Sequence, residues 1–525
     1  MPKPIDGLPT LIEALTDPAC YDHAVEPVRL IETHISHVLL TGGFAYKIKK
    51  PLNLGFLDFS TLDKRLQVCH EEVRLNRRLA PATYLDVVPI TGTLASPRMN
   101  GPGEAIEYAV KMRQFPPDAT LDQLDAQGKL TARHVGAIAV TIAQFHLDGC
   151  ERARTESPWG NPEKIWQPVE QNFQQIAPRL VDPADTQRLV ALHRWSEAEH
   201  ARLAPLLTKR KRDGFIRECH GDLHLGNLAW ADDQLLVFDC IEFNPELRWI
   251  DIMSEVAFCF MDLLHRQHKD WAWLFLNTWL ETTGDYAGLA LLRYYTVYRA
   301  LVRAKVDFLR AEQTRGASRD AATVEGRAYL QLAGELTRPI SLQLDITHGL
   351  SGSGKTTVTQ TLMQTPGAIR LRSDVERKRL AGLDALARSR SGIGQDLYAA
   401  DTTRRTYTHL ARLAGEALDA GWPVIVDATC IVRWQRDLFR RLAQTHGADF
   451  RILDFQVPLA TLRERILGRA RQGGDASEAD LGVLQYQIET QEPLAAEEMR
   501  EVLAIQDTAL PPQSKGSIHG EKRDD

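Results

Sequence analysis

The sequence has little of what would place it in a membrane or in an oxidising compartment. Its 525 residues include seven cysteines, which are scattered without a CxxC pair or a metal-like spacing, so we expect free thiols in a reducing cytoplasm. The most apolar stretch, Val256 to Leu264, is far shorter than the ~20 residues that a membrane span needs. The N-terminal residues lack the apolar segment of a signal peptide. A cytoplasmic protein without a membrane partner is therefore predicted.

Positive charge is also not in excess. The net charge is −6, which weighs against a chain built around nucleic acid, although it leaves a local basic patch possible. The hydrophobic share of 44% and the charged share of 25% are those of a globular protein. At roughly 150 residues per domain, the length predicts two to four domains.

Strand and helix patterns divide the first 337 residues into two lobes. A small, mostly β lobe is predicted at about 25–115 and a helical lobe at about 116–337. A short helix is expected at 9–20, before the first strand. The basic run Lys209 to Arg212 is predicted to be a solvated loop.

The pattern changes after residue 337. From 338 to about 508, apolar strands alternate with helices, which predicts a parallel sheet covered on both faces. The polar segment 509–525 is predicted to be disordered. The fold class is thus multidomain, with an α+β part followed by an α/β part.

The first motif with chemical content is His-Gly-Asp-Leu-His-Leu-Gly-Asn at 220–227. Asn227 follows Asp222 by five residues, the interval of a kinase catalytic loop, in which the aspartate orients the acceptor hydroxyl and the asparagine binds Mg²⁺. A second metal-binding carboxylate has to come from a neighbouring strand. Asp239, at the end of an apolar run, is the candidate.

A kinase site also needs a lysine on a strand and a glutamate on the next helix. Phe-Ala-Tyr-Lys, ending at Lys47, has the form of the Val-Ala-Ile-Lys motif, although Lys49 shares its strand face. Glu72 is the preferred partner on the helix expected at 61–79, with Glu71 as the alternative. The predicted ATP-binding pair is therefore Lys47 and Glu72.

These features resemble the aminoglycoside phosphotransferase family, relatives of choline and fructosamine kinases, over about 25–330. The resemblance implies a protein-kinase-like bilobal fold and ATP-dependent phosphorylation of a small-molecule hydroxyl. No Ala-Pro-Glu segment follows Asp239, which favours small-molecule over protein kinases. The turn expected to cover the phosphates, at 32–36, has no glycine, although Ser36 could serve there. Arg299 and Arg303 are candidate acceptor-pocket residues on helices that otherwise read as core.

The second motif, Gly-Leu-Ser-Gly-Ser-Gly-Lys-Thr at 349–356, follows a strand and opens a helix. This context makes it a specific phosphate-binding loop, in which backbone N–H groups hold the β-phosphate, the lysine reaches the β/γ oxygens and the threonine binds Mg²⁺. The predicted nucleotide-binding residues are Gly349, Gly352, Ser353, Gly354, Lys355, Thr356 and Thr357.

The neighbours of this loop suggest further roles. Asp427 ends an apolar strand and is the predicted Mg²⁺ partner, while Asp374 is the candidate catalytic base. Arg372 and Arg377 either hold an anionic acceptor or lie on a solvated helix. Arg465 and Arg469 share one helix face and resemble the lid arginines of small kinases, with a solvated face as the alternative.

Residues of about 342–505 resemble P-loop kinases that include polynucleotide, gluconate and zeta-toxin-like enzymes. The tandem order resembles bacterial proteins described as bifunctional aminoglycoside phosphotransferase/ATP-binding proteins. The resemblance implies two sites that use ATP and Mg²⁺ to phosphorylate hydroxyls of small molecules. Two alternatives stay open: a C-terminal polynucleotide 5′-hydroxyl kinase, with nucleic acid not favoured, and a regulatory ATP-binding protein with one non-catalytic half.

Overall fold

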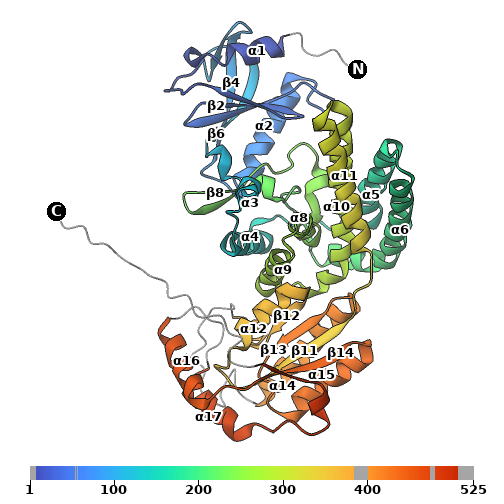
Figure 1. The fold of residues 1–525 in the computed structure, drawn as a ribbon. Helices are drawn as coiled ribbons and strands as arrows, with labels where there is room; N and C mark the ends of the chain where they lie inside the picture. The colour runs from blue at the N-terminus through green and yellow to red at the C-terminus, as the bar shows by residue number, and fades with distance from the viewer. Residues whose placement is uncertain (1–6, 54, 56, 384–399, 473–478, 506–525) are drawn as a thin grey trace, which may run out of the picture. The chain divides into compact units, whose positions relative to one another are not determined.

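The computed structural model describes residues 7–53, 55, 57–383, 400–472 and 479–505 (Figure 1). The chain divides into two compact units. The first comprises the chain up to Trp279 together with Leu291–Arg338, and the second comprises Leu280–Ala290 and the chain from Pro339 onward. The segment 509–525, predicted to be disordered, lies outside the described residues. None of the described helices has the length and apolar content that a membrane span requires.

The first unit begins with an antiparallel sheet of order β1-β2-β3-β6-β4-β5. Its strands are β1 (Arg29–Glu32), β2 (Ser36–Leu40), β3 (Phe44–Lys49), β4 (Tyr84–Thr93), β5 (Ser96–Met99) and β6 (Ala105–Arg113). Helix α1 (Leu8–Ala14) covers one side, where it packs against Tyr46 and Ile48. Successive side chains of a strand point to opposite faces, so Lys47 and Lys49 face the other side, toward α2 (Leu62–Asn76).

The helix predicted at 9–20 is shorter than expected. It ends at Ala14, and a separate 3₁₀ turn, η1 (Pro18–Cys20), follows. Proline lacks the N–H that continues an α-helix, and the Asp17 side chain instead accepts the Ala19 N–H at 2.9 Å to start the new turn.

Helices form the rest of the first unit, together with two strand pairs, β8–β9 and β7–β10. The strands are β7 (Ile216–Glu218), β8 (Leu228–Ala231), β9 (Gln234–Val237) and β10 (Trp249–Asp251). The helices are α3 (Leu121–Ala126), α4 (Ala132–Gln144), α5 (Pro162–Ile176), α6 (Pro183–Arg212), α7 (Pro245–Arg248), α8 (Ile252–His265), α9 (Lys269–Thr283), α10 (Leu289–Gln313) and α11 (Ala317–Leu336). Helix α8 is buried from Ile252 to Leu263, which places it at the centre of this lobe.

The prediction of a solvated loop for the basic run 209–212 is wrong. These residues form the last turn of α6, where cations favourably face the helix C-terminus. Arg210 is buried and pairs with Asp251 at 2.7 Å, and Lys211 donates to the Asn161 side chain at 2.5 Å. A partner distant in sequence thus decides the burial of both side chains.

The second unit is built on a parallel sheet of order β12-β13-β11-β14-β15. The strands are β11 (Gln343–His348), β12 (Ile369–Arg372), β13 (Val424–Asp427), β14 (Asp449–Phe455) and β15 (Val502–Ile505). The helices are α12 (Lys355–Leu362), α13 (Ser373–Leu380), α14 (Ala400–Asp419), α15 (Arg433–His446), α16 (Leu459–Gln472) and α17 (Leu481–Thr490). Because all five strands are parallel, their carboxyl ends meet at one edge, where the loop after β11 lies.

Candidate active sites

The first site contains a buried ion-pair cluster between β3 and α2. The Lys47 ammonium lies 2.8 Å from Glu72 and also contacts Asp239. Glu71, the alternative partner, instead pairs with Arg248 at 2.7 Å. The structure therefore brings Lys47, Glu72 and Asp239 together, as the sequence predicts for an ATP-binding lysine.

Lys49 is part of the same cluster. Its ammonium lies 2.5 Å from Glu72 and also contacts Glu242. Glu242 is a residue that the sequence analysis did not identify, and burial raises the pKa of its carboxyl. Burial alone would lower the pKa of Lys47, but Asp239 and Glu72 hold it well above its ordinary value. Lys47 therefore stays cationic, as a phosphate-binding lysine must.

Asp222 and Asn227 are in direct contact. The Asn227 amide donates to the Asp222 carboxylate and to its backbone oxygen, both at 2.9 Å, which fixes the aspartate relative to the loop. His224 lies 3.4 Å from the same carboxylate. Burial raises the pKa of Asp222, yet His224 and Arg303 bring it below its ordinary value. The carboxylate is therefore ionised at neutral pH.

Asp239, two residues after the end of β9, has an unusual backbone conformation. Its φ is 64°, a left-handed conformation that is uncommon for a residue with a side chain. Its N–H donates to the Tyr84 hydroxyl at 3.1 Å. The preceding Phe238 links the hairpin to the loop, because its N–H donates to the Asn227 backbone oxygen at 3.0 Å and its oxygen bonds the His220 ring at 2.8 Å.

The donor set at this site fits the Mg²⁺ that the resemblance implies. Asn227 offers an amide oxygen and Asp239 a carboxylate, and Mg²⁺ binds through hard oxygen ligands of this kind. Lys47 contacts Asp239, so a cation already balances that carboxylate.

The turn between β1 and β2 is closed on itself. The Ser36 N–H donates to the Thr33 hydroxyl at 2.9 Å, and the Thr33 N–H donates to the Ser36 backbone oxygen at 2.9 Å. Ser36 is fully buried, and its hydroxyl has no hydrogen-bond partner among the described residues. In this conformation the Ser36 N–H is already bonded within the turn.

The second site lies at the carboxyl end of β11. The Lys355 ammonium donates to the backbone oxygens of Gly349 at 2.9 Å and Leu350 at 2.8 Å, so the loop wraps around it. Gly352 has a φ of 85°, and a Cβ there would lie 3.0 Å from the Leu462 backbone oxygen. Glycine is therefore required at this position by both space and backbone conformation. Thr356 and Thr357 are exposed on the first turn of α12.

Four predicted polar residues lie on the neighbouring strands and helix. Asp427 ends β13, is buried, and accepts the Thr359 hydroxyl at 3.2 Å. Arg372, its register partner on β12, comes within 4.0 Å of it. Asp374, in the first turn of α13, pairs with Arg377 at 3.0 Å. Arg377 therefore contacts the candidate base.

The sequence analysis missed two contacts of this unit. Gln487 of α17 accepts the Ser351 N–H at 2.8 Å and donates to its hydroxyl at 3.0 Å, so it holds the phosphate-binding loop. Glu281 pairs with Arg370 at 2.8 Å and lies 3.5 Å from Arg372. No local motif marks either residue, because both approach the loop or strand from elements distant in sequence.

The predicted lid arginines are described unequally. Arg465 is half-buried on α16, whereas the side chain of Arg469 lies outside the described residues. The structure therefore leaves their shared role as a prediction.

Two protein families match separate segments of this chain. Residues 57–292 match the phosphotransferase enzyme family, and residues 344–494 match the AAA domain family. An uncharacterized protein of Mycobacterium tuberculosis and one of Mycobacterium bovis are each 29% identical over 470 residues, which covers 88% of this chain and 91% of theirs.

Two solved structures are also similar to this chain. A choline kinase from Cryptosporidium parvum is 12% identical, with a TM-score of 0.38, and the match covers 63% of this chain and 95% of that one. A gluconokinase from Sinorhizobium meliloti is 21% identical, with a TM-score of 0.23, over 33% of this chain and 86% of that one.

The family matches and the two sheet topologies confirm the predicted fold classes and the predicted tandem order. The antiparallel sheet and helical lobe form the first part, and the five-stranded parallel sheet with its phosphate-binding loop forms the second. This chain thus joins a domain of the phosphotransferase enzyme family to a P-loop domain of the AAA type.

Proposed function

We propose that this protein is an ATP- and Mg²⁺-dependent phosphotransferase with two phosphoryl-transfer sites on unrelated folds. Each site transfers the γ-phosphoryl group of ATP to a hydroxyl of a small molecule. The observation that carries the proposal is the first site's geometry, in which Asn227 holds Asp222 while Lys47 joins Glu72 to Asp239.

In the first site, the ionised Asp222 accepts a hydrogen bond from the acceptor hydroxyl. This bond directs the hydroxyl oxygen toward the γ-phosphorus of ATP. Asn227 keeps the carboxylate in that orientation. Lys47 binds the α/β phosphates, and Glu72 keeps its ammonium in place. Mg²⁺ bound by Asn227 and Asp239 would offset phosphate charge.

In the second site, the loop N–H groups and Lys355 bind the phosphates, and Thr356 and Asp427 are the proposed Mg²⁺ partners. Asp374 is the proposed base toward the acceptor hydroxyl. Its carboxylate pairs with Arg377 at 3.0 Å. Arg465 and Arg469 are proposed to neutralise charge on the transferring group.

We further propose that both activities take place in the cytoplasm. The seven cysteines are unpaired, which is typical of proteins in a reducing compartment. The net charge of −6 favours small-molecule acceptors over nucleic acid.

The test is phosphorylation of a pool of small-molecule hydroxyl compounds with γ-labelled ATP. We expect Asp222→Asn to abolish one set of labelled products and Lys355→Ala to abolish the other. Each loss should exceed about 100-fold, because each residue acts at the reacting phosphate. Matched controls are Asp233→Asn and Arg412→Ala, which alter exposed ion pairs and should leave both product sets unchanged.

Unchanged turnover in both site variants would refute the proposal. A 5′-hydroxyl oligonucleotide that wild type labels and Lys355→Ala does not would identify the second site as a polynucleotide kinase. Tight ATP binding without labelled product in one half would identify that half as regulatory.

A further inference from the structure

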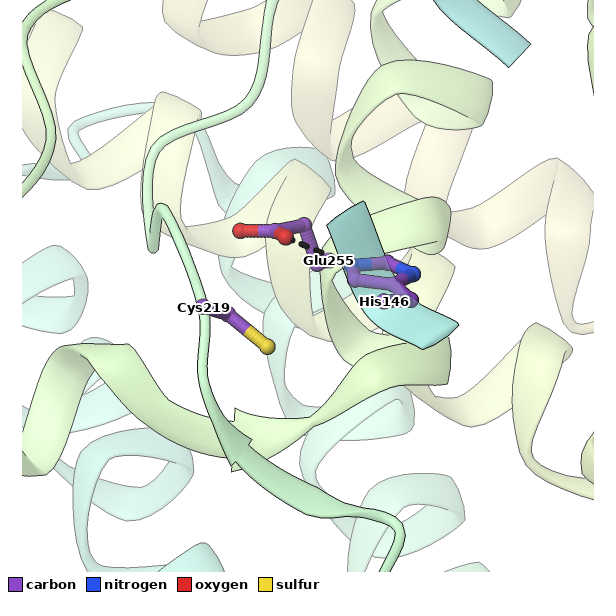
Figure 2. Close-up of side chains that lie close together, drawn as sticks. All are labelled: His146, Cys219 and Glu255. Carbon is purple, nitrogen blue, oxygen red and sulfur yellow. Dashed lines mark hydrogen bonds and ion pairs between the residues drawn. The ribbon is translucent and has the colours of Figure 1, made fainter. Parts of the chain in front are cut away.

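Three buried side chains with metal-binding chemistry lie close together in the first unit (Figure 2). They are His146 on the π-helical turn η3 (Phe145–Gly149), Cys219 just after β7, and Glu255 on α8. Their ligand atoms lie within 4.8 Å of one another. Such a cluster can hold a metal ion or form a network of hydrogen bonds. The position of the proton on the His146 ring distinguishes the two.

The tautomer of His146 follows from its neighbour Trp279. An indole nitrogen can only donate, and the Trp279 N–H lies 3.1 Å from His146 Nδ1. Nδ1 is therefore the acceptor, and the proton of the neutral ring is on Nε2, which donates to Glu255 at 2.7 Å. A metal on Nε2 would move that proton to Nδ1, where it would face the indole N–H. Burial also holds the pKa of the Cys219 thiol well above its ordinary value.

The other oxygen of Glu255 leads to the catalytic loop. It accepts the N–H of Gly221, the residue before Asp222, at 2.8 Å. On the opposite side, Arg299 donates to the Gly221 backbone oxygen at 3.2 Å. Gly221 has a φ of 91°, and a Cβ there would lie 2.8 Å from the Leu247 backbone oxygen. Side chains of α8 and α10 therefore hold both the backbone N–H and the backbone oxygen of Gly221.

The same helix supports the far side of the loop. Asp262 of α8 accepts the Leu225 N–H at 2.9 Å. Glu255 and Asp262 are seven residues apart, so they lie on one face of α8, about two turns from each other. Both are buried. Two acids of one helix thus bind the backbone on either side of Asp222.

We propose that Glu255 is a positioning residue for the first transfer site, with its carboxylate oriented by His146 and Trp279. The inference rests on the proposed phosphotransferase function. Glu255 fixes the peptide that precedes Asp222, and Asp262 fixes the peptide that follows it at Leu225. The network sets the direction of the Asp222 carboxylate and does not bind ATP.

The test compares Glu255→Gln with wild type in a Lys355→Ala background, in which only the first site turns over. The glutamine amide has a single oxygen, so its N–H₂ would face either the His146 Nε2–H or the Gly221 N–H, and two donors would meet at one of these two places. We expect kcat to fall by about 10- to 100-fold, the range given by one misplaced buried hydrogen bond. The KM for ATP should change by less than about threefold, because Lys47 is untouched.

A rescue variant distinguishes the network from general damage. Adding Trp279→Phe removes the indole donor, so His146 can carry its proton on Nδ1 and accept from the glutamine amide. We expect this double variant to recover at least about threefold in kcat over Glu255→Gln alone. Glu312→Gln, which alters an exposed ion pair on α10, is the matched control.

Hydrogen exchange of residues 219–227 is the readout that does not depend on catalysis. Glu255→Gln should speed exchange at Gly221, and Asp262→Ala should do so at Leu225, even if no acceptor is turned over. Unchanged kcat and unchanged exchange would overturn the proposal, as would stoichiometric zinc in wild type that Glu255→Gln loses. A wild type without ATP turnover, but with the expected exchange pattern, would refute only the phosphotransferase function.

Discussion

Asp222 lies among groups that shift its pKa in opposite directions. Burial raises the pKa, while the His224 ring at 3.4 Å and the Arg303 guanidinium lower it, and the lowering prevails. An aspartate that orients an acceptor hydroxyl has to be ionised to accept its hydrogen bond. The side chains around Asp222 thus supply an electrostatic condition that the proposed reaction requires.

Replacing His224 should make this dependence visible. His224→Asn keeps a side-chain acceptor for the Gly226 N–H, which His224 Nδ1 now accepts at 3.1 Å, but removes the ring beside Asp222. The pKa of Asp222 should then rise toward its ordinary value. The acid limb of kcat for the first site should move to higher pH, measured in a Lys355→Ala background.

The direction of that shift follows from the ionised form being active. A higher pKa leaves less carboxylate at a given acidic pH, so activity is lost earlier as pH falls. His70→Asn, an exposed residue of α2, is the control. An acid limb that stays in place would show that His224 does not govern the ionisation of Asp222.

At the scale of elements, long-range ion pairs hold several helices and strands in position. Arg210 at the end of α6 pairs with Asp251 at the start of α8. In the second unit, Arg436 of α15 makes two hydrogen bonds to Glu498, at 2.8 and 3.0 Å, and both side chains are fully buried or nearly so. Glu498 begins the 3₁₀ turn η9 (Glu498–Arg500), which leads into β15, so this pair anchors the segment before the last strand of the sheet.

Removal of Glu498 should loosen that edge of the sheet. Glu498→Ala leaves the Arg436 charge buried without its partner, and breaking a buried pair in this way costs about 3–5 kcal/mol. Hydrogen exchange of Val502–Ile505 in the full chain would measure the loss. Glu497→Ala removes the exposed partner of Arg433 and should leave the exchange protection of β15 nearly unchanged.

The same pair predicts an acid dependence. Burial raises the pKa of Glu498, but hydrogen bonds from Arg436, the Ala495 N–H and Arg440 together lower it from 4.5 to about 2 in the folded protein. A lowered folded pKa means that the stabilisation is complete above 4.5 and is lost as pH falls toward about 2. In Glu498→Ala this part of the acid sensitivity should be absent. An equal loss of protection in both proteins between those pH values would contradict the assignment.

At the scale of the whole molecule, the two units do not follow one another simply along the chain. Leu280–Ala290 belongs to the second unit, although α10 continues into the first. Within the second unit, Trp422 donates to the Leu289 backbone oxygen at 3.1 Å, and the Tyr286 hydroxyl lies 3.3 Å from Glu376. The sequence boundary at 337/338 therefore omits a segment that the second unit uses.

A fragment that begins at Pro339 should reveal this omission. It lacks Leu280–Ala290, so Arg370 loses Glu281 and the Trp422 N–H loses its acceptor. Each lost interaction of this kind contributes about 0.5–1.5 kcal/mol, so the fragment should unfold about 1–3 kcal/mol more easily than the same unit in the full chain. Urea unfolding followed by exchange at β11 and β13 measures the difference, and equal stability would contradict it.

The sequence predicted much of the local structure and of the site chemistry. The two loops could be located because phosphate chemistry needs fixed spacings, such as five residues from Asp222 to Asn227 and the Gly-Lys-Thr that ends the second loop. Strand periodicity placed Lys47 and Lys49 on one face, since side chains alternate along a strand. The parallel sheet followed from the alternation of strands and helices.

Contacts between distant segments could not be predicted in this way. Periodicity gave no reason to expect Arg210 and Lys211 to be buried, because their partners lie far away in sequence. Glu72 and Glu71 are equivalent as neighbours in a helix, and only the rotation of α2 against β3 directs Glu72 to Lys47. The sequence by itself determined which groups could act on a phosphate. Tertiary structure decided which of them meet. It also decided which distant side chains, Glu255 and Gln487, bind the backbone of the two loops, because long-range packing fixes those contacts.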